Sequence, residues 1–254
     1  MPEKASLTGD LLALGVQPGG VLLVHSSLRS LGPIPRASER GSGAEVMVQS
    51  LLEALGPQGT LLMPALSYAT VGAHNPYFDV RSTPSCVGAL PEYFRTRAGT
   101  LRSVHPTHSV CGAGRRAAEL LADHIRDRTP VGSGSPFARL PKIGGQILFL
   151  GCGLMPNTSM HGVEEHVVPP YLYANDVEYQ VTLADGSQAH MTVRSHNFQG
   201  WIQRYDRLGD LMKKGCRKGQ VLQAECYLLD AAEAWFAALT QLRANPLYFI
   251  DKAE

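Results

Sequence analysis

Residues 148–165 read LFLGCGLMPNTSMHGVEE, and the fold is predicted outward from this stretch. It opens with an apolar, strand-like run that ends in a glycine turn, and a short polar segment then leads into a helix-like pattern. A strand that turns through glycine into a helix leaves backbone N–H groups unpaired and directs side chains toward one point. We therefore predict a strand over 145–151, a tight turn, and a functional site at the start of the next helix.

Two side chains of this stretch have the chemistry of a proton-transfer pair. His161 carries the side chain best suited to proton transfer near neutral pH, and Glu164 follows three residues later. If 160–165 is helical, both side chains lie on one face, and the carboxylate could orient the imidazole and raise its basicity. The same pattern also fits a capped helix with a buried histidine, and spacing alone does not separate these interpretations.

Composition and charge narrow the class of protein. The 254 residues are 44% hydrophobic and 18% charged, with a formal net charge of +1. This balance is typical of a globular protein and gives no electrostatic argument for nucleic-acid binding. No apolar run is long enough to span a membrane, and the first residues lack an apolar signal segment, so we expect a cytoplasmic protein. The five cysteines include no CxxC pair, which favours reduced thiols.

Strand-like and helix-like patterns alternate along the first 165 residues. The predicted strands are 19–25, 59–64, 101–104 and 145–151, and the predicted helices are 7–14 (capped by Ser6, or by Thr8 if it starts later), 43–55, 88–96 and 112–125. This alternation predicts an α/β fold with a mostly parallel central sheet flanked by helices. Asp185-Gly186 between two β-rich runs predicts a β-hairpin over 179–193, and 229–242 predicts a C-terminal helix. No linker divides the chain, so we expect a single domain over residues 1–254.

Two further segments are rich in hydrogen-bond donors. The sequence HSSL (25–28) follows the first predicted strand, where hydroxyls and backbone N–H groups could hold a phosphate or a pantetheine amide. The segment RSVHPTHS (102–109) has no carboxylate, which suits an anionic group. The first segment also fits a plain strand-to-loop cap, and the second a polar loop with local hydrogen bonds.

Histidine spacing raises the question of a metal site. His105 and His108 form an HxxH pair without a third ligand at helical spacing, and His161 and His166 lie five residues apart on different helix faces. We therefore expect His161 to act as a general base rather than a metal ligand, and we expect no bound metal. A metal-dependent hydrolase that uses these four histidines stays open as an alternative.

Taken in order, these motifs resemble the aminoglycoside 3-N-acetyltransferase family. The blocks that carry the resemblance are VHSSLRSLG (24–32), EALGPQGTLLMP (53–64), FDVRSTPSCVGALPEYFR (78–95), GTLRSVHPTHSVCGAG (99–114), GSPFARL (134–140) and ILFLGCGLMPNTSMHGVEE (147–165). The last block is the most specific, because the family reads Asn-Thr-(Ser/Thr)-Leu-His-x-x-Glu where this chain runs from Asn157 to Glu164. The resemblance implies the antibiotic N-acetyltransferase fold, which is unrelated to GNAT enzymes. It also implies acetyl transfer from acetyl-CoA to the 3-amino group of a 2-deoxystreptamine aminoglycoside, conferring antibiotic resistance.

The resemblance also implies roles for individual residues. It makes His161 the catalytic base and Glu164 its carboxylate partner, and it assigns two segments to CoA. The expected CoA-binding residues are His25, Ser26, Ser27, Leu28, Arg102, Ser103, Val104, His105 and Ser109. In a direct attack of the amine on the thioester, the Thr158 hydroxyl is a candidate donor to the oxyanion. An acyl-enzyme route through Cys152 stays open.

The acceptor is harder to define than the acetyl donor. A polycationic aminoglycoside needs acidic partners, and Tyr68, Asp79, Glu92 and Glu178 are the residues that we expect to bind it, in a monomer or a homodimer. The chain is nearly neutral, and PRASERGSG (35–43) replaces the compact Gly-Gly turn usual in the family. Two alternatives therefore stay open: an acetyltransferase of the same fold that acts on another amine, and a non-catalytic CoA- or nucleotide-binding protein.

Overall fold

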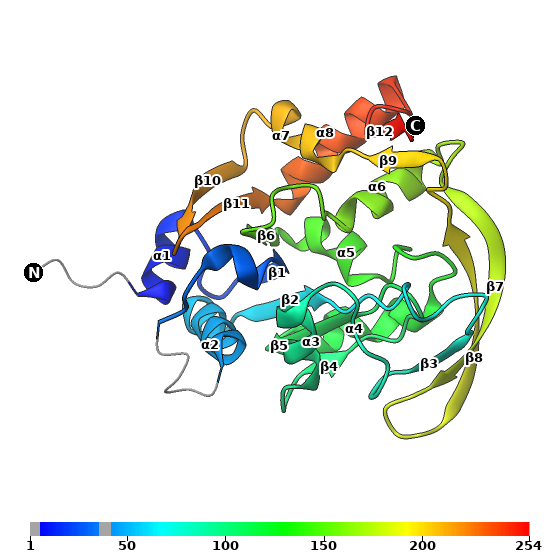
Figure 1. Ribbon diagram of the computed structural model, residues 1–254, viewed down its shortest axis with the longest axis horizontal. Coiled ribbons are helices and arrows are strands. Elements are labelled where there is room, and N and C mark those ends of the chain that lie inside the picture. The colour runs from blue at the N-terminus through cyan, green and yellow to red at the C-terminus, as the bar shows by residue number, and fades with distance from the viewer. Residues whose placement is uncertain (1–5, 36–41, 254) are drawn as a thin grey trace, which may run out of the picture.

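The computed structural model describes residues 6–35 and 42–253, and three adjacent parallel strands form its centre (Figure 1). These are β6 (Gln146–Leu150), β1 (Val21–Ser26) and β2 (Thr60–Pro64), with β1 in the middle. Every residue of β2 is buried, as expected of a parallel strand covered on both faces. Three of the four predicted strands, 19–25, 59–64 and 145–151, are therefore confirmed, whereas of 101–104 only Leu101–Arg102 forms a strand. Of the segment 35–43, residues 36–41 lie outside the described residues.

Antiparallel strands extend this centre on both sides. β11 (Ala224–Asp230) pairs with β6 and β10 (Cys216–Val221) with β11, while β5 (Val110–Gly114) pairs with β2 and β4 (Leu101–Arg102) with β5. The sequence does not predict the β10–β11 hairpin, because β10 is polar and mostly exposed and its turn lacks a Gly, Asn or Asp signal.

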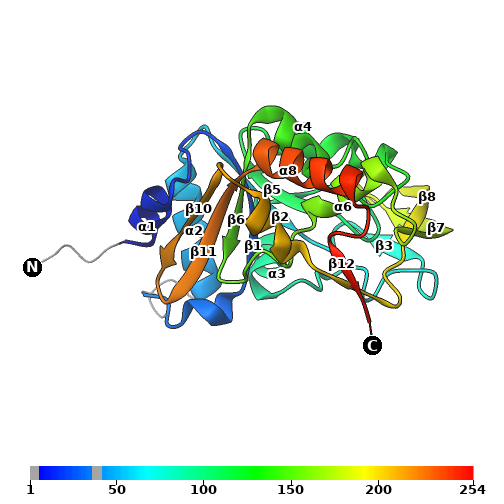
Figure 2. The same ribbon diagram turned by 90° about the horizontal axis from the view of Figure 1, so that it is seen from above.

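Helices cover both faces of the sheet (Figures 1 and 2). One face carries α1 (Leu7–Leu14), α2 (Gly43–Leu55) and α3 (Ala89–Thr96), and the other carries α4 (Ala117–Leu121), α5 (Pro136–Arg139), α6 (Ser159–Val167) and α8 (Ala231–Ala244). Side chains alternate along each strand, so Leu22 packs on the first layer and Leu23 on the second. The helix-flanked α/β fold is thus confirmed, and so is Ser6 as the cap of α1.

Two predicted helices need correction. Residues 112–114, the start of the expected helix 112–125, belong to β5, and only 117–121 are α-helical. Gly112 and Gly114 allow β5 to lie close to β2: a Cβ on Gly114 would lie 2.2 Å from the Gly59 carbonyl oxygen. The expected helix 229–242 begins later, because Leu229 belongs to β11 and Asp230 caps α8 by accepting from the Glu233 N–H.

A second, three-stranded sheet lies beside the centre. It contains β3 (Tyr77–Asp79), β7 (Tyr173–Thr182) and β8 (Gln188–His196), and the β7–β8 hairpin forms the edge of the molecule farthest from the N-terminus (Figure 1). The hairpin predicted around Asp185-Gly186 is confirmed, with both strands longer than expected. The remaining elements are β9 (Trp201–Gln203), α7 (Leu208–Leu211), β12 (Ile250–Lys252) and the 3-10 turns Leu28–Leu31, Ala122–Arg126, Leu140–Ile143 and Tyr205–Arg207.

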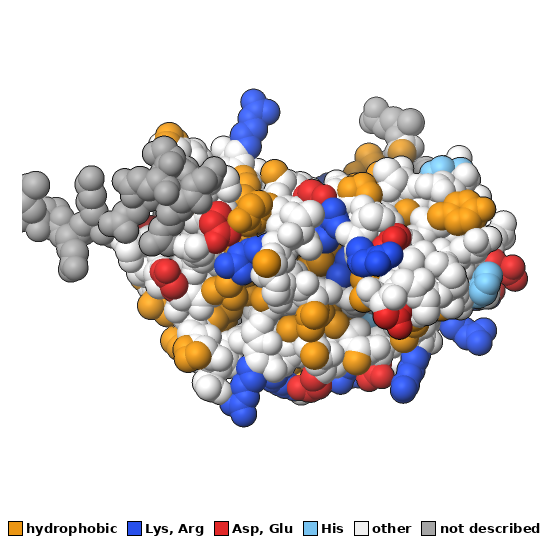
Figure 3. Space-filling model, turned by 90° about the horizontal axis from the view of Figure 1, so that it is seen from below, with side chains coloured by type: hydrophobic (Ala, Val, Ile, Leu, Met, Phe, Trp, Pro, Cys, Tyr) orange, Lys and Arg blue, Asp and Glu red, His pale blue; other side chains and the backbone are white. Residues whose placement is uncertain are grey.

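The surface carries charges of both signs. On the face drawn in Figure 3, the Lys and Arg side chains of the described residues lie among Asp and Glu side chains, without a large patch of one sign. This distribution agrees with the formal net charge of +1. None of the helices in the described part of the chain is long and apolar enough to cross a lipid bilayer.

Candidate active site

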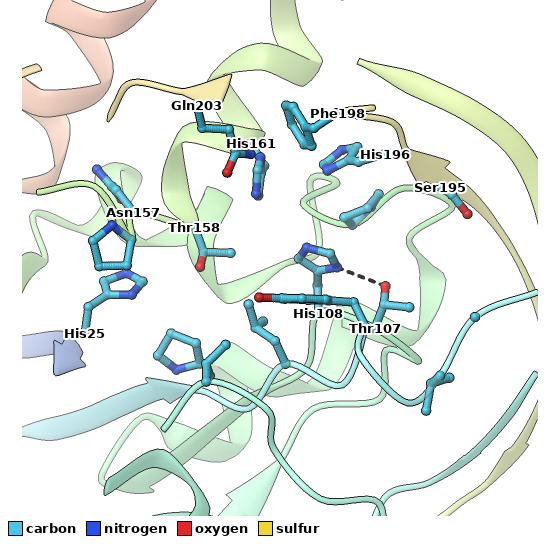
Figure 4. Close-up of a pocket in the computed structure, with 18 of the residues that line it drawn as sticks. His25, Thr107, His108, Asn157, Thr158, His161, Ser195, His196, Phe198 and Gln203 are labelled. Carbon is cyan, nitrogen blue, oxygen red and sulfur yellow. Dashed lines mark hydrogen bonds between the residues drawn. The ribbon is translucent and has the colours of Figure 1, made fainter. Parts of the chain in front are cut away.

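A pocket of about 510 Å³ lies at the carboxyl ends of the parallel strands (Figure 4). His25 and Ser26 reach it from the end of β1, Pro64 from the end of β2, and Thr158 and His161 from the turn after β6 and the first turn of α6. Ligands of open α/β sheets bind at this position, because loops diverge there and side chains converge. Other residues that line the pocket include Tyr68, His74, Thr107, His108, Asn157, Tyr179, Ser195, His196, Phe198, Gln203 and Tyr205.

His161 lines the pocket and is held by a buried carboxylate that does not line it. Its Nδ1 lies 3.0 Å from Glu164 Oε2, and the Glu164 side chain is 0% exposed. An ionised carboxylate can only accept hydrogen bonds, so Nδ1 carries the ring proton and Nε2 keeps its lone pair. The two residues lie on one face of α6, so the predicted pair is brought together.

Two tyrosines complete the surroundings of Glu164. Tyr205 Oη donates to Glu164 Oε2 and Tyr171 Oη donates to Oε1, each at 2.8 Å. Burial, followed by the negative charge of Glu164, raises the pKa of both tyrosines well above the ordinary range, so their hydroxyls stay protonated. Three donors therefore compensate the buried charge of one carboxylate.

A second histidine–glutamate pair lies next to the first. His196 Nε2, from the end of β8, lies 2.9 Å from Glu165 Oε1. The Thr129 hydroxyl and the Val131 N–H also donate to this carboxylate. Burial raises the pKa of Glu165, and burial together with nearby His161 lowers the pKa of His196 well below its ordinary value. His196 is therefore a neutral ring with its lone pair on Nδ1.

His108 joins these two rings in what we call the histidine cluster, consisting of His108, His161 and His196. The ring centroids of His161 and His196 are 4.8 Å apart, and His108 lies 5.7 Å from His161 and 5.8 Å from His196. His108 Nδ1 lies 2.9 Å from the Thr107 hydroxyl oxygen, and the three rings surround the same part of the pocket (Figure 4). Burial lowers the pKa of His108 well below its ordinary value, so this ring is also neutral.

Four buried polar atoms of pocket residues have no hydrogen-bond partner within the described ranges 6–35 and 42–253. They are His25 Nε2, Ser26 Oγ, Asn157 Oδ1 and His196 Nδ1. Such atoms cost free energy unless a ligand or water supplies the missing partners. Burial lowers the pKa of His25 to about 3, so it meets a ligand as a neutral ring. Neutral donors and acceptors of this kind suit uncharged amide and carbonyl groups of a ligand.

The other residues expected to bind CoA lie elsewhere. Among the nine, only His25 and Ser26 line the pocket. Ser27 Oγ is 2.8 Å from Ser30 Oγ, and Leu28 begins a 3-10 turn against the first apolar layer. Ser27 and Leu28 therefore have the geometry of a strand-to-loop cap, which is the alternative interpretation of the segment 25–28.

Arg102, expected at an anion site, has its guanidinium held within the protein. It donates to the Ala65 and Thr83 carbonyls and to the Ser109 hydroxyl, and burial lowers its pKa to about 10. These bonds engage all three guanidinium nitrogens. Because Arg102 belongs to β4 and donates to the Thr83 carbonyl, it links the irregular segment 66–87 to the central sheet.

The rest of segment 102–109 is held by local contacts. Ser103 Oγ accepts from the Val110 N–H, and His105 Nδ1 accepts from the Thr107 and His108 N–H groups. Val104 packs against a small apolar cluster between the segment 71–80 and the β7–β8 hairpin. The local hydrogen bonds orient Thr107 and His108 toward the pocket, so the segment contributes a wall rather than an anion cradle.

Of the four residues expected to bind the acceptor, only one lines the pocket. Tyr68 lines the pocket and is 54% exposed. Asp79 accepts from the Arg81 N–H, Glu92 pairs with Arg95, and Glu178 is exposed on β7. Within the part of the chain that the structure describes, no carboxylate lines the pocket.

Sequence reasoning missed Tyr171, Tyr205 and the pairing of Glu165 with His196. Tyr205 lies 41 residues from Glu164, and His196 lies 31 residues from Glu165. A periodicity argument detects partners within one helix or hairpin and not across such separations. No local pattern in the sequence could have found these partners.

Comparisons with known proteins place the whole chain in one family. The family model of aminoglycoside 3-N-acetyltransferases matches residues 23–243. Aminoglycoside N(3)-acetyltransferase IV from Salmonella sp is 34% identical over 99% of this chain and 92% of its own. A mutant of aminoglycoside acetyltransferase AAC(3)-IVa in complex with a gentamicin superposes with a TM-score of 0.78, at 30% identity over 97% of this chain and 90% of that one. AAC-IIIb in a binary complex with CoASH has a TM-score of 0.79, at 28% identity over 94% and 95% of the two chains.

Proposed function

This chain belongs to the aminoglycoside 3-N-acetyltransferase family, and we propose that it transfers acetyl from acetyl-CoA to the 3-amino group of a 2-deoxystreptamine aminoglycoside. The observation that carries the proposal is His161, which lines a pocket at the ends of the parallel strands and is paired with the buried Glu164. The complexes of relatives with CoASH and with a gentamicin support the same pair of substrates. Acetylation removes a positive charge from such an antibiotic and so weakens its binding to RNA.

In the proposed reaction, His161 acts as the general base through Nε2. It takes the proton from the acceptor amine as the nitrogen attacks the thioester carbonyl carbon. The C–N bond forms, the tetrahedral intermediate collapses, and the C–S bond breaks. The proton held by His161 passes to the departing CoA sulfur. General base catalysis of this kind contributes about 10²- to 10⁴-fold to a rate.

Glu164 is a positioning residue in this scheme. It holds Nδ1–H so that Nε2 faces the pocket, and its charge stabilises the imidazolium that forms after proton transfer. The hydroxyls of Tyr171 and Tyr205 hold the carboxylate and remain donors throughout the reaction. The base therefore changes its charge while its surroundings stay fixed, which keeps reorganisation small.

The oxyanion of the intermediate is stabilised from the start of α6. Thr158 occupies the N-cap position, yet its side chain makes no cap hydrogen bond to the helix. Its hydroxyl is therefore available to donate to the developing oxyanion, supported by the positive end of the helix dipole. Asn157 lines the same wall and provides a side-chain amide for the thioester region.

Direct transfer is favoured over an acyl-cysteine intermediate. Burial raises the pKa of the Cys152 thiol to about 12, so the nucleophilic thiolate is scarce at neutral pH. His161 lines the pocket, whereas Cys152 does not and packs against the second apolar layer. We expect Cys152→Ala to retain acetyl transfer without a burst phase, and burst kinetics in the wild type that Cys152→Ala abolishes would contradict direct attack.

The neutral lining of the pocket favours a second candidate acceptor. A polycation gains most from carboxylates, and no described lining residue carries one. The lone pairs of His108 and His196 can accept hydrogen bonds from one ammonium group, which suits an amine of low charge. An N-acetyltransferase of the same fold that acts on another amine is therefore the second candidate.

An acceptor panel tests the proposal and separates the two candidates. Purified protein and acetyl-CoA are mixed with gentamicin-, neomycin- and apramycin-type compounds and with small monoamines, and thiol release is followed. Release with aminoglycosides, and acetylation at N3 by NMR, supports the first candidate. Release with monoamines alone supports the second, and no release with any amine, despite CoA binding, contradicts both.

A further inference from the structure

The histidine cluster has the hydrogen-bond pattern of a metal site. In such sites, each histidine binds the metal through one ring nitrogen while a carboxylate or another acceptor holds the other nitrogen. Glu164 holds Nδ1 of His161, and Glu165 holds Nε2 of His196. Each of these rings therefore directs one unprotonated nitrogen away from its carboxylate.

The remaining observations concern distance and unmet partners. One ring nitrogen each from His108, His161 and His196 lies within 4.8 Å of the other two. His108 Nδ1 is held by the Thr107 hydroxyl, and His196 Nδ1 is buried without a hydrogen-bond partner among the described residues. In a tetrahedral zinc site, ligand nitrogens are about 3.3 Å apart, so these three must approach one another by up to about 1.5 Å when a metal binds.

We propose that His108, His161 and His196 form a three-histidine site for a divalent transition metal such as Zn²⁺, and that the bound metal inhibits the enzyme. Three imidazoles select zinc, nickel or copper, whereas Mg²⁺ and Ca²⁺ require oxygen ligands. A water or an amine takes the fourth position. Metal bound to His161 Nε2 removes the lone pair that accepts the proton, and this inhibitory part rests on the proposed function.

The test uses metal alone, without substrates. Chelator-treated protein is titrated with Co²⁺, whose absorption spectrum reports tetrahedral coordination, and Zn²⁺ affinity is then measured against a colorimetric chelator. We expect one equivalent per chain in the wild type, and loss of this binding in His108→Ala and His196→Ala. His74→Ala is the matched control, because His74 lines the same pocket outside the cluster, and it should bind like the wild type.

Two outcomes would overturn the site: no stoichiometric binding by the wild type, or equal binding by the wild type and both cluster variants. Circular dichroism verifies that the variants fold. If an alanine variant does not fold, Thr107→Val is measured in its place. Loss of the hydroxyl that contacts His108 Nδ1 should weaken the metal affinity about 10-fold.

The inhibitory role has a separate readout. Chelator-treated wild type should transfer acetyl at its full rate, stoichiometric Zn²⁺ should suppress the rate, and added chelator should restore it. If metal binds without affecting the rate, the inhibitory part is wrong while the site stands. If no acetyl transfer occurs in chelated protein, the proposed function fails while the metal titration still decides the site.

Discussion

Glu164 is a carboxylate with no exposed surface, and its charge is tolerated because every neighbour donates to it. An unpaired buried charge costs several kcal/mol, so Glu164 needs the His161 ring and the hydroxyls of Tyr171 and Tyr205 for the stability of the fold. The same contacts fix the tautomer and the direction of the His161 ring. Stability and base function therefore depend on one set of hydrogen bonds.

Replacing the carboxylate tests this dependence. Glu164→Gln keeps the shape of the side chain but loses the charge that stabilises the His161 imidazolium, so we expect kcat to fall about 10²- to 10⁴-fold with little change in the KM for acetyl-CoA. The matched variant Glu165→Gln acts on His196 and should mainly raise the KM for the amine. Steady-state kinetics separate the two, and equal effects of both variants on kcat would contradict a specific role for Glu164.

The active site could be predicted only where its members are close in sequence. His161 and Glu164 are three residues apart on one helix, so helical periodicity alone places them together. Tyr205 and His196 come from segments that meet α6 only in the folded chain. Arg102 illustrates a second limit of local patterns, since a cation in a polar loop predicts an anion site, whereas its donation to the Thr83 and Ala65 carbonyls depends on the folded chain.

At the scale of elements, the position of α6 depends on its contact with α8. Gly162, adjacent to His161, lies against the Trp235 ring of α8: a Cβ added at Gly162 would lie 2.6 Å from Trp235 and 2.8 Å from Val131. Glycine in a helix interior costs about 1 kcal/mol relative to alanine. The close approach of the two helices explains why a glycine is nevertheless accommodated there.

Gly162→Ala should therefore destabilise the protein despite the better helix propensity of alanine. Overpacking typically costs about 1–3 kcal/mol, and displacement of α6 should also lower kcat through His161. Gly209→Ala in α7 is the matched control, because its Cβ would contact only the end of the Leu154 side chain at 3.1 Å. Urea unfolding measures both variants, and an unchanged or higher unfolding free energy for Gly162→Ala would contradict the packing argument.

Elements were predictable where hydrophobic periodicity is strong. The bounds of α1 and α2 agree with the sequence pattern, because both have a serine cap and a clear apolar stripe. The last three residues of β5, Gly112 to Gly114, are predicted to begin the helix 112–125, because a glycine-rich turn before an alanine-containing run is typical of a helix start. The extended conformation of β5 comes from pairing with β2, which is a tertiary effect.

At the scale of the whole molecule, a buried acid links stability to pH. Burial, followed by the nearby charges of Glu165 and Asp123, raises the pKa of Asp127 to about 6, although its Oδ1 accepts from the Gly134 N–H. The folded state thus binds this proton more tightly than the unfolded state does. The resulting stabilisation is fully present below about pH 4 and is lost as the pH rises through about 6.

Asp127→Asn removes this titration and should make the folded protein more stable above pH 7, by up to about 3 kcal/mol. Below pH 4 the variant and the wild type should have similar unfolding free energies. Urea unfolding at pH 4, 6 and 8 measures the difference. A variant that is less stable than the wild type at pH 8 would contradict the assigned direction of the shift.

Acetyl transfer by the wild type compared with His161→Ala tests the central claim most directly. Thiol release from acetyl-CoA is measured with the best acceptor of the panel, together with CoA affinity by calorimetry. The account predicts that His161→Ala binds CoA like the wild type and releases thiol about 10²- to 10⁴-fold more slowly. A variant that binds CoA and keeps the wild-type rate would contradict the assignment of His161 as the base.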